Sequence, residues 1–190
     1  MINHKTEMLL VLLYAGEEIM ANRQKSTSVT GITRLEKLLF LIKETGLLKY
    51  TAAQEEFHFV PFHMGPWSNE VYDVVDFLES MGLIRKEAGG EKLPEDIAHD
   101  EELFSATVLE RYQKTKMSGD EKTEVYILTD IGREKAEQIW ARLSKEERSI
   151  IIELKKKFNS MNLRQLLRYI YKMYPEYAVD SKIKDFLGLE

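Results

Sequence analysis

The chain has 190 residues, 44% of them hydrophobic, which is enough for one substantial core. It contains no cysteine, which excludes a disulfide framework and thiolate chemistry. The longest apolar run, Met8 to Ala15, is too short to cross a membrane and lacks a signal-peptide pattern, so we expect a cytoplasmic protein with no membrane partner.

The formal net charge of −5 is unevenly distributed along the chain. Residues 61–130 carry 7 basic and 16 acidic side chains, whereas residues 131–190 carry 13 basic and 9 acidic ones. The two regions therefore suit partners of opposite charge.

Two helices are predicted at the start of the chain. The first runs from His4 to Asn22, and the polar stretch 25–30 connects it to a second helix from Ile32 to Gly46. Apolar residues recur at helical spacing in the first helix, at Leu9, Leu12, Leu13, Ile19 and Met20. Arg34 and Lys37 are expected on the solvated face of the second helix, with a phosphate or acidic partner as the alternative.

A strand, a tight turn and a third helix follow. The aromatic run Phe57–Phe62 favours a strand, with Pro61 placing it at a sheet edge, and Gly65-Pro66 breaks it. Ser68 is predicted to cap a helix that Gly82 ends, before a strand from Leu83. The apolar positions of this helix are Val71, Val74, Val75, Leu78 and Met81.

The next stretch predicts a β-wing interrupted by an acidic insertion at about 87–103. Residues 104–115 alternate in polarity, a turn signal follows at 118–120, and residues 123–128 favour a strand. With residues 83–86, these two runs are expected to form a three-stranded antiparallel wing.

The remaining residues predict helices. Thr129-Asp130 caps one that carries Ile131, Ala136, Ile139, Trp140 and Leu143 on one face. Ser144 and Glu147 fit a capping box for the next. A last helix, Leu163–Tyr174, stops before Pro175, and Ile183, Phe186 and Leu187 are expected to dock the C-terminal segment.

This order is typical of a winged helix-turn-helix. We therefore expect an α+β winged-helix-like domain at residues 1–143, with a C-terminal helical extension at 144–190 packed on it.

The helix after the Gly-Pro turn contains no basic residue from Ser68 to Met81. Each of its carboxylates would be repelled by a nearby phosphate by ~1 kcal/mol even in water, which argues against insertion into a DNA groove. We expect instead that this face binds a basic protein partner, the alternative being a solvated acidic helix. The residues assigned to this contact are Trp67, Asn69, Glu70, Tyr72, Asp73 and Asp76. For Trp67 and Tyr72 the competing interpretation is core filling.

A second hypothesis is a DNA-binding transcriptional regulator that uses the late helices. Its candidate residues are Arg148, Lys155, Lys156, Lys157, Arg164 and Arg168, with Lys172 beside them. The alternatives for these cations are an ordinary solvated face and a contact between copies of the chain.

Enzymatic chemistry has little support. The four histidines form no recognised motif, and His58 and His63 fall on opposite faces of the expected strand. The pair Asp73 and Asp76 is expected to be solvated rather than an acid–base pair. We therefore expect no catalytic residue, cofactor or metal.

Three segments resemble a known family: Leu35-Glu36-Lys37-Leu38-Leu39-Phe40, then Gly65-Pro66-Trp67-Ser68-Asn69-Glu70-Val71-Tyr72, and Met81-Gly82-Leu83-Ile84. Over about residues 5–175 the chain resembles SocA-like antitoxin (Panacea) domain proteins and prokaryotic winged-helix proteins of the YwgA type. The resemblance implies a winged-helix-like fold without enzymatic activity and a role in regulating or neutralising a partner protein, with some members acting near DNA. Trp67 stands where the antitoxin pattern has a small aliphatic residue, and the acidic insertion is longer than in that pattern.

Overall fold

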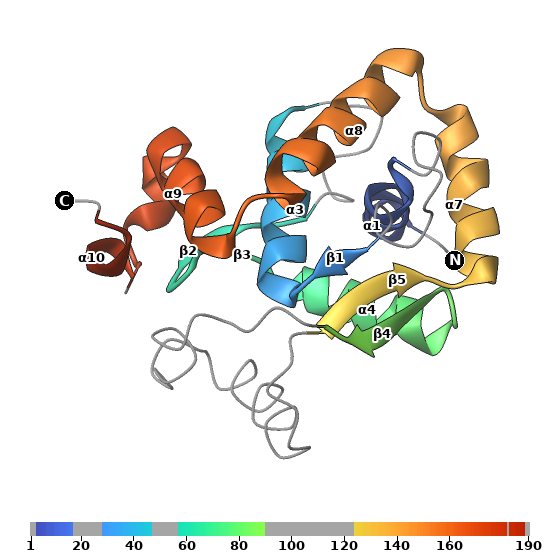
Figure 1. Ribbon diagram of the computed structural model, residues 1–190, viewed down its shortest axis with the longest axis horizontal. Coiled ribbons are helices and arrows are strands. Elements are labelled where there is room, and N and C mark those ends of the chain that lie inside the picture. Colours follow the sequence, from blue (N-terminus) through green and yellow to red (C-terminus); the bar gives the residue numbers. More distant parts are fainter. Residues whose placement is uncertain (1–2, 17–27, 47–56, 90–123, 182, 189–190) are drawn as a thin grey trace.

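Helix α1 (His4–Tyr14) lies at the centre of the molecule (Figure 1). The computed structural model describes residues 3–16, 28–46, 57–89, 124–181 and 183–188. Asn3 caps α1 by accepting the backbone N–H of Thr6, and Leu9, Leu10, Leu12 and Leu13 are fully buried around its circumference. A helix that is apolar on all sides must be surrounded by other elements. The expected continuation of this helix over 17–22 lies outside the described residues.

A three-stranded antiparallel sheet borders α1, in the order β1 (Val29–Thr30), β5 (Glu124–Leu128) and β4 (Ile84–Ala88). Strand β4 pairs with β5 along its whole length, from Ile84 opposite Leu128 to Ala88 opposite Glu124. The third strand is therefore β1, within the stretch that we expected to be only a connection. The strand predicted over 104–115 lies outside the described residues. The acidic insertion was expected to begin at about residue 87, but residues 87 and 88 still belong to β4.

The second sheet is a small hairpin that connects two helices. It joins α3 (Ile32–Glu44) to α4 (Asn69–Ser80) through β2 (Val60–Phe62) and β3 (Gly65–Trp67). Both helices occur where the periodicity predicts them. The predicted strand is shorter than expected, because Phe57 and Phe59 are buried without joining a ladder.

Helices α7 (Asp130–Arg142) and α8 (Lys145–Asn159) cover α1 and α3. The Thr129 cap and the Ser144–Glu147 capping box are both present. Helix α7 packs closely on the residue that precedes β4, since a Cβ at Gly132 would lie 1.8 Å from the carbonyl oxygen of Leu83. That contact places the start of α7 beside the end of α4.

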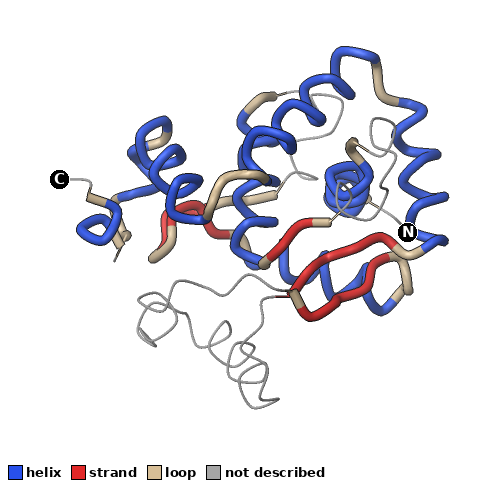
Figure 2. The backbone as a smooth tube through the Cα atoms, viewed as in Figure 1, coloured by secondary structure: helices blue, strands red, loops and turns tan. Residues whose placement is uncertain are grey.

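The remaining elements form one end of the molecule (Figure 2). They are α9 (Leu163–Met173), the 3₁₀ helix η4 (Pro175–Ala178) and α10 (Lys184–Leu187), which pack against one another and against the β2–β3 hairpin. Ile183 and Leu187 are buried as expected. One continuous apolar cluster runs from Met8 to Leu187, so the late helices share the core of the preceding elements. Within the described residues, no helix is both long and apolar enough to cross a membrane.

Candidate functional site

The Gly-Pro hairpin sets where α4 begins. In this hairpin Phe62 pairs with Gly65 and Val60 pairs with Trp67. Gly65 has a φ of +87°, which disfavours residues with a side chain, and a Cβ there would lie 2.8 Å from the ring of Tyr171. The hairpin therefore needs glycine both for its backbone angle and for its contact with α9.

A buried ion pair ties α3 to the exit of this hairpin. The Nζ of Lys37 lies 2.6 Å from the Oε2 of Glu36 and donates to the carbonyl oxygen of Pro66 at 2.8 Å. The Oε1 of Glu36 accepts the backbone N–H of Ser68 at 3.0 Å. Burial raises the pKa of the Glu36 carboxyl, and Lys37 and the Ser68 N–H offset this only in part. The segments Leu35–Phe40 and Gly65–Tyr72 are thus joined by direct hydrogen bonds.

Lys37 and Arg34 were expected on a solvated face, and that expectation is wrong. Both are buried. The Arg34 guanidinium donates to the carbonyl oxygens of Phe158, Asn159 and Met161 at the end of α8. Positive charge stabilises the exposed carbonyls at a helix C-terminus, so Arg34 serves as a cap supplied by α3.

Glu70, at the start of α4, is held by two partners. Its Oε1 lies 2.7 Å from the Nζ of Lys5 on α1, and its Oε2 accepts the backbone N–H of His58 at 2.8 Å. Partial burial raises the pKa of Glu70, but the hydrogen bonds from Lys5 and His58 outweigh this effect and leave the pKa below its usual value. Glu70 therefore anchors α4 to α1, unlike the surface carboxylates further along the helix.

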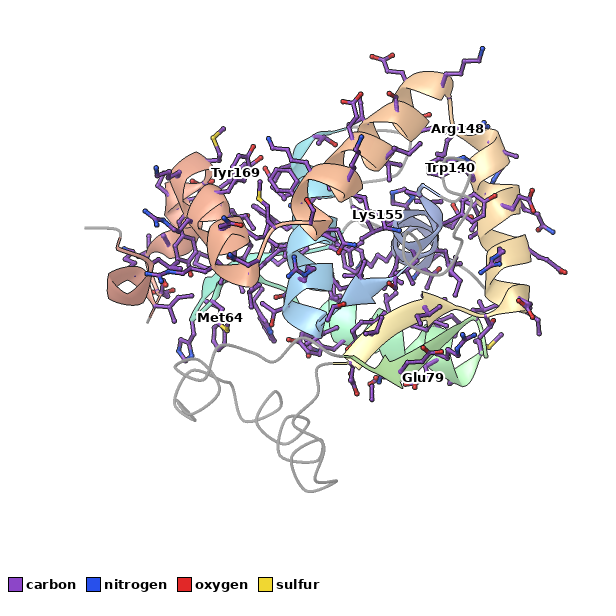
Figure 3. All side chains as sticks on the ribbon, in the orientation of Figure 1. Met64, Glu79, Trp140, Arg148, Lys155 and Tyr169 are labelled. Atoms are coloured by element: carbon purple, nitrogen blue, oxygen red, sulfur yellow. The ribbon has the colours of Figure 1, made fainter. Side chains whose placement is uncertain are left out.

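The other carboxylates of α4 lie at the surface. Lys86 on β4 bridges two of them, with its Nζ 2.8 Å from Glu79 and 3.9 Å from Asp76 (Glu79 is labelled in Figure 3). Asp73 is exposed, accepts the side-chain amide of Asn69 at 3.3 Å and forms no ion pair within the described ranges. The face is acidic, as expected, but Lys5 and Lys86 neutralise part of its charge.

Trp67 and Tyr72, the two aromatic residues predicted to contact a protein partner, are not exposed apolar groups at the surface. Tyr72 is only 8% exposed and belongs to the core, and Trp67 is half-buried with its ring 5.2 Å from that of Phe62. The exposed apolar residues of α4 are instead Phe77, 37% exposed, and Met81 just beyond its end, 56% exposed. Met81 was predicted to face the core.

A third apolar residue lies close to the end of α4. Ile131, the second residue of α7, is 66% exposed although its spacing predicted burial. Thr129 donates its hydroxyl to the carbonyl oxygen of Gly82 at 2.6 Å, which brings the start of α7 beside Met81. We call the exposed residues of this region the α4 face: Asn69, Asp73, Asp76, Phe77, Glu79, Met81 and Ile131.

The cations proposed for DNA binding fall into two groups. Lys155 is buried and points from α8 towards α1, where its Nζ donates to the carbonyl oxygens of Leu13 and Ala15 (Figure 3). Arg148 is half-buried and donates to the carbonyl oxygen of Ala141 at 2.9 Å. The exposed members are Lys156, Lys157, Arg164, Arg168 and Lys172. Lys155 therefore cannot contact a partner at the surface.

A groove of about 440 Å³ lies between α1 and α7, and the ion pair of Glu7 and Arg142 crosses it. Across the described residues, no three His, Cys, Asp or Glu side chains are grouped so that they could hold a metal ion. His63 stacks on Phe62, with the ring centroids 4.3 Å apart.

Comparison with known proteins adds no further assignment. No family model, curated protein or solved structure matches this chain. The resemblance to the antitoxin and YwgA-type families therefore stays a prediction from the residues themselves.

Proposed function

We propose that this chain is a non-enzymatic regulatory protein of the winged-helix type, resembling SocA-like antitoxins, which binds a basic protein partner through the α4 face. The element order α1, β1, α3, β2, β3, α4, β4, β5, in which the β2–β3 hairpin lies between α3 and α4, and the sheet order β1-β5-β4 support the winged-helix assignment. In such a fold, α4 occupies the place of the helix that would enter a DNA groove.

One observation carries the choice of a protein partner: exposed carboxylates and exposed large apolar side chains occur together on the α4 face. Asp73, Asp76 and Glu79 would each be repelled by a nearby phosphate by ~1 kcal/mol in water. The side-chain amide of Asn69, a group suited to reading a base, already donates to Asp73.

The same features suit a protein surface that carries both positive charge and apolar groups. Phe77 and Met81 lie four residues apart, so their side chains emerge one turn apart from the same side of α4. Large side chains of this kind supply most of the free energy at protein interfaces, whereas surrounding charges steer approach and select the partner. Asp73, with no cation paired to it in the described ranges, is the carboxylate best placed to receive a partner's Lys or Arg.

The experiment compares partner capture by three forms of the full chain: the natural sequence, Asp73→Lys/Asp76→Lys, and Glu134→Lys/Glu137→Lys. The control pair lies at exposed positions of α7 and produces the same change in net charge. Each form is immobilised, exposed to lysate of the source cells, and the retained proteins are identified by mass spectrometry at low and high salt. Circular dichroism checks that each form is folded.

We expect a basic protein that is retained by the natural sequence and the α7 control, is lost with the α4 variant, and is released by salt. Phe77→Ser should also weaken its retention at constant charge. If the α4 variant retains the same proteins as the control, the α4 face is not the contact surface and the proposal is wrong.

A further inference from the structure

We propose that a second surface, formed by the end of α8 and the outer side of α9, binds the sugar-phosphate backbone of nucleic acid. We call it the basic face: Lys156, Lys157, Arg164, Arg168 and Lys172. It shares no residue with the α4 face and does not depend on the protein partner proposed above.

The cations of α9 form a straight row. Arg164, Arg168 and Lys172 are exposed and are spaced four residues apart, which places them on one side of the helix about 6 Å apart along its axis. In the described part of the chain, neither Arg168 nor Lys172 forms an ion pair. A row of exposed cations suits a linear polyanion better than a single small anion.

The end of α8 adds two more cations beside this row. The Nζ of Lys157 lies 4.8 Å from the ring centre of Phe158 and 4.9 Å from that of Tyr169, a residue of α9 on the side that faces α8 (Figure 3). This cation–π contact holds the ammonium group at the junction of the two helices. Lys156 is the adjacent exposed residue.

No opposing charge lies within this stretch of the sequence. From Leu154 to Pro175 there is no aspartate or glutamate, although the whole chain has a net charge of −5. Electrostatic attraction of a polyanion to this protein should therefore be confined to the basic face, because the remaining surface is acidic on average.

The row of cations on α9 is held in place by a well-anchored helix, which favours contacts with the sugar-phosphate backbone of a nucleic acid. Helix α9 begins with a capping box formed by Asn162 and Gln165, and its opposite side is anchored by buried Leu166, Leu167 and Ile170. Figure 1 shows α9 at one end of the molecule, apart from α4. Contacts from Lys and Arg to phosphates depend on salt and not on base sequence.

The test measures binding of a fluorescent 20-base-pair DNA duplex of mixed sequence to the full chain by anisotropy between 50 and 200 mM NaCl. Three forms are compared: the natural sequence, Arg168→Glu/Lys172→Glu, and Arg85→Glu/Lys145→Glu. The last is the matched control, since Arg85 and Lys145 are exposed on β4 and at the start of α8 and give the same change in net charge. Circular dichroism checks that each form keeps the helical content of the natural sequence.

With about four phosphate contacts, we expect affinity to fall on the order of 10²-fold over this salt range. Arg168→Glu/Lys172→Glu should abolish most of the binding. It should also reduce the slope of log affinity against log salt concentration by about 2, whereas the control should bind nearly as the natural sequence does. No binding at 50 mM NaCl, or equal losses in both variants, would overturn the proposal. So would retention on phosphatidylserine vesicles without binding to duplex or to the corresponding single strand, since that result would assign the face to lipid.

Discussion

The Nζ of Lys155, on α8, lies 2.7 Å from the carbonyl oxygen of Leu13 near the end of α1. A second carbonyl, that of Ala15, accepts from the same ammonium group at 3.0 Å. The lysine thus caps a helix that is distant in sequence, and this contact takes Lys155 out of the basic face while Lys156 and Lys157 remain exposed.

Replacing this buried cation should destabilise the protein. Lys155→Met keeps the length of the side chain but leaves the two carbonyl groups without their donor, so we expect the free energy of unfolding to fall by about 1–3 kcal/mol. Lys156→Met, at the exposed neighbouring position, should change it by no more than about 0.5 kcal/mol. Urea unfolding followed by circular dichroism measures both, and equal effects would contradict the capping role.

Breaking the Glu36–Lys37 pair should be among the most damaging single changes. Lys37→Met leaves the Glu36 carboxylate buried without its cation, a loss of about 3–5 kcal/mol for pairs of this kind. The double variant Glu36→Gln/Lys37→Met removes the charge and keeps an oxygen to accept the Ser68 N–H. It should therefore be more stable than Lys37→Met alone in chemical denaturation, and a double variant that is less stable would exclude this explanation.

Two glutamates should give opposite pH dependences. Burial raises the pKa of Glu36, so the folded protein binds a proton there more readily than the unfolded chain, and this contribution to stability grows as the pH falls towards 4.5. The pKa of Glu70 is lowered, so its contribution is present above 4.5 and is lost as the pH falls through the folded value.

We expect the stability difference between the natural sequence and Glu36→Gln to shift in favour of the natural sequence on acidification from pH 7 to 4. The difference from Glu70→Gln should shift the other way. Chemical denaturation at a series of pH values measures both slopes, and slopes of the same sign would refute the opposite pKa directions.

Comparing alanine substitutions at Gly65 and Gly82 distinguishes the effect of backbone strain from that of a steric clash. Both have positive φ, +87° and +65°, so alanine at either should cost about 1–2 kcal/mol. Only at Gly65 would the new methyl group meet a neighbour, the ring of Tyr171. Gly65→Ala should therefore lower the thermal midpoint further than Gly82→Ala.

The additional destabilisation by Gly65→Ala should be smaller when Tyr171→Ala is also present, because the effects of substitutions at residues in contact are not additive. Additive losses in the double variant would mean that the ring does not limit the hairpin.

Local sequence signals predicted much of the framework. Helical spacing marked α3 and α4, and capping residues marked α7 and α8, since a helix is stabilised by contacts within a few residues. Ser68 is the N-cap residue of α4 as predicted, but its side chain makes no capping hydrogen bond. Strand β1 was missed because two residues show no alternation, and its pairing with β5 depends on a segment about a hundred positions away.

The candidate site was predicted only in part. The acidic character of α4 could be counted from its residues, but the neutralising Lys5 and Lys86 come from other elements. The burial of Arg34, Lys37 and Lys155 was missed for the same reason, because each is satisfied by carbonyl groups distant in sequence. Periodicity also predicted burial of Met81, whereas the packing against α4 stops short of it.

The pairing of Ala88 with Glu124 closes β4 and β5 at one end, so the chain leaves and re-enters the sheet at neighbouring positions. Because the entropy of closing a loop grows only slowly with its length, joining β4 to β5 across residues 89–123 costs only about 2 kcal/mol more than joining them across a four-residue turn.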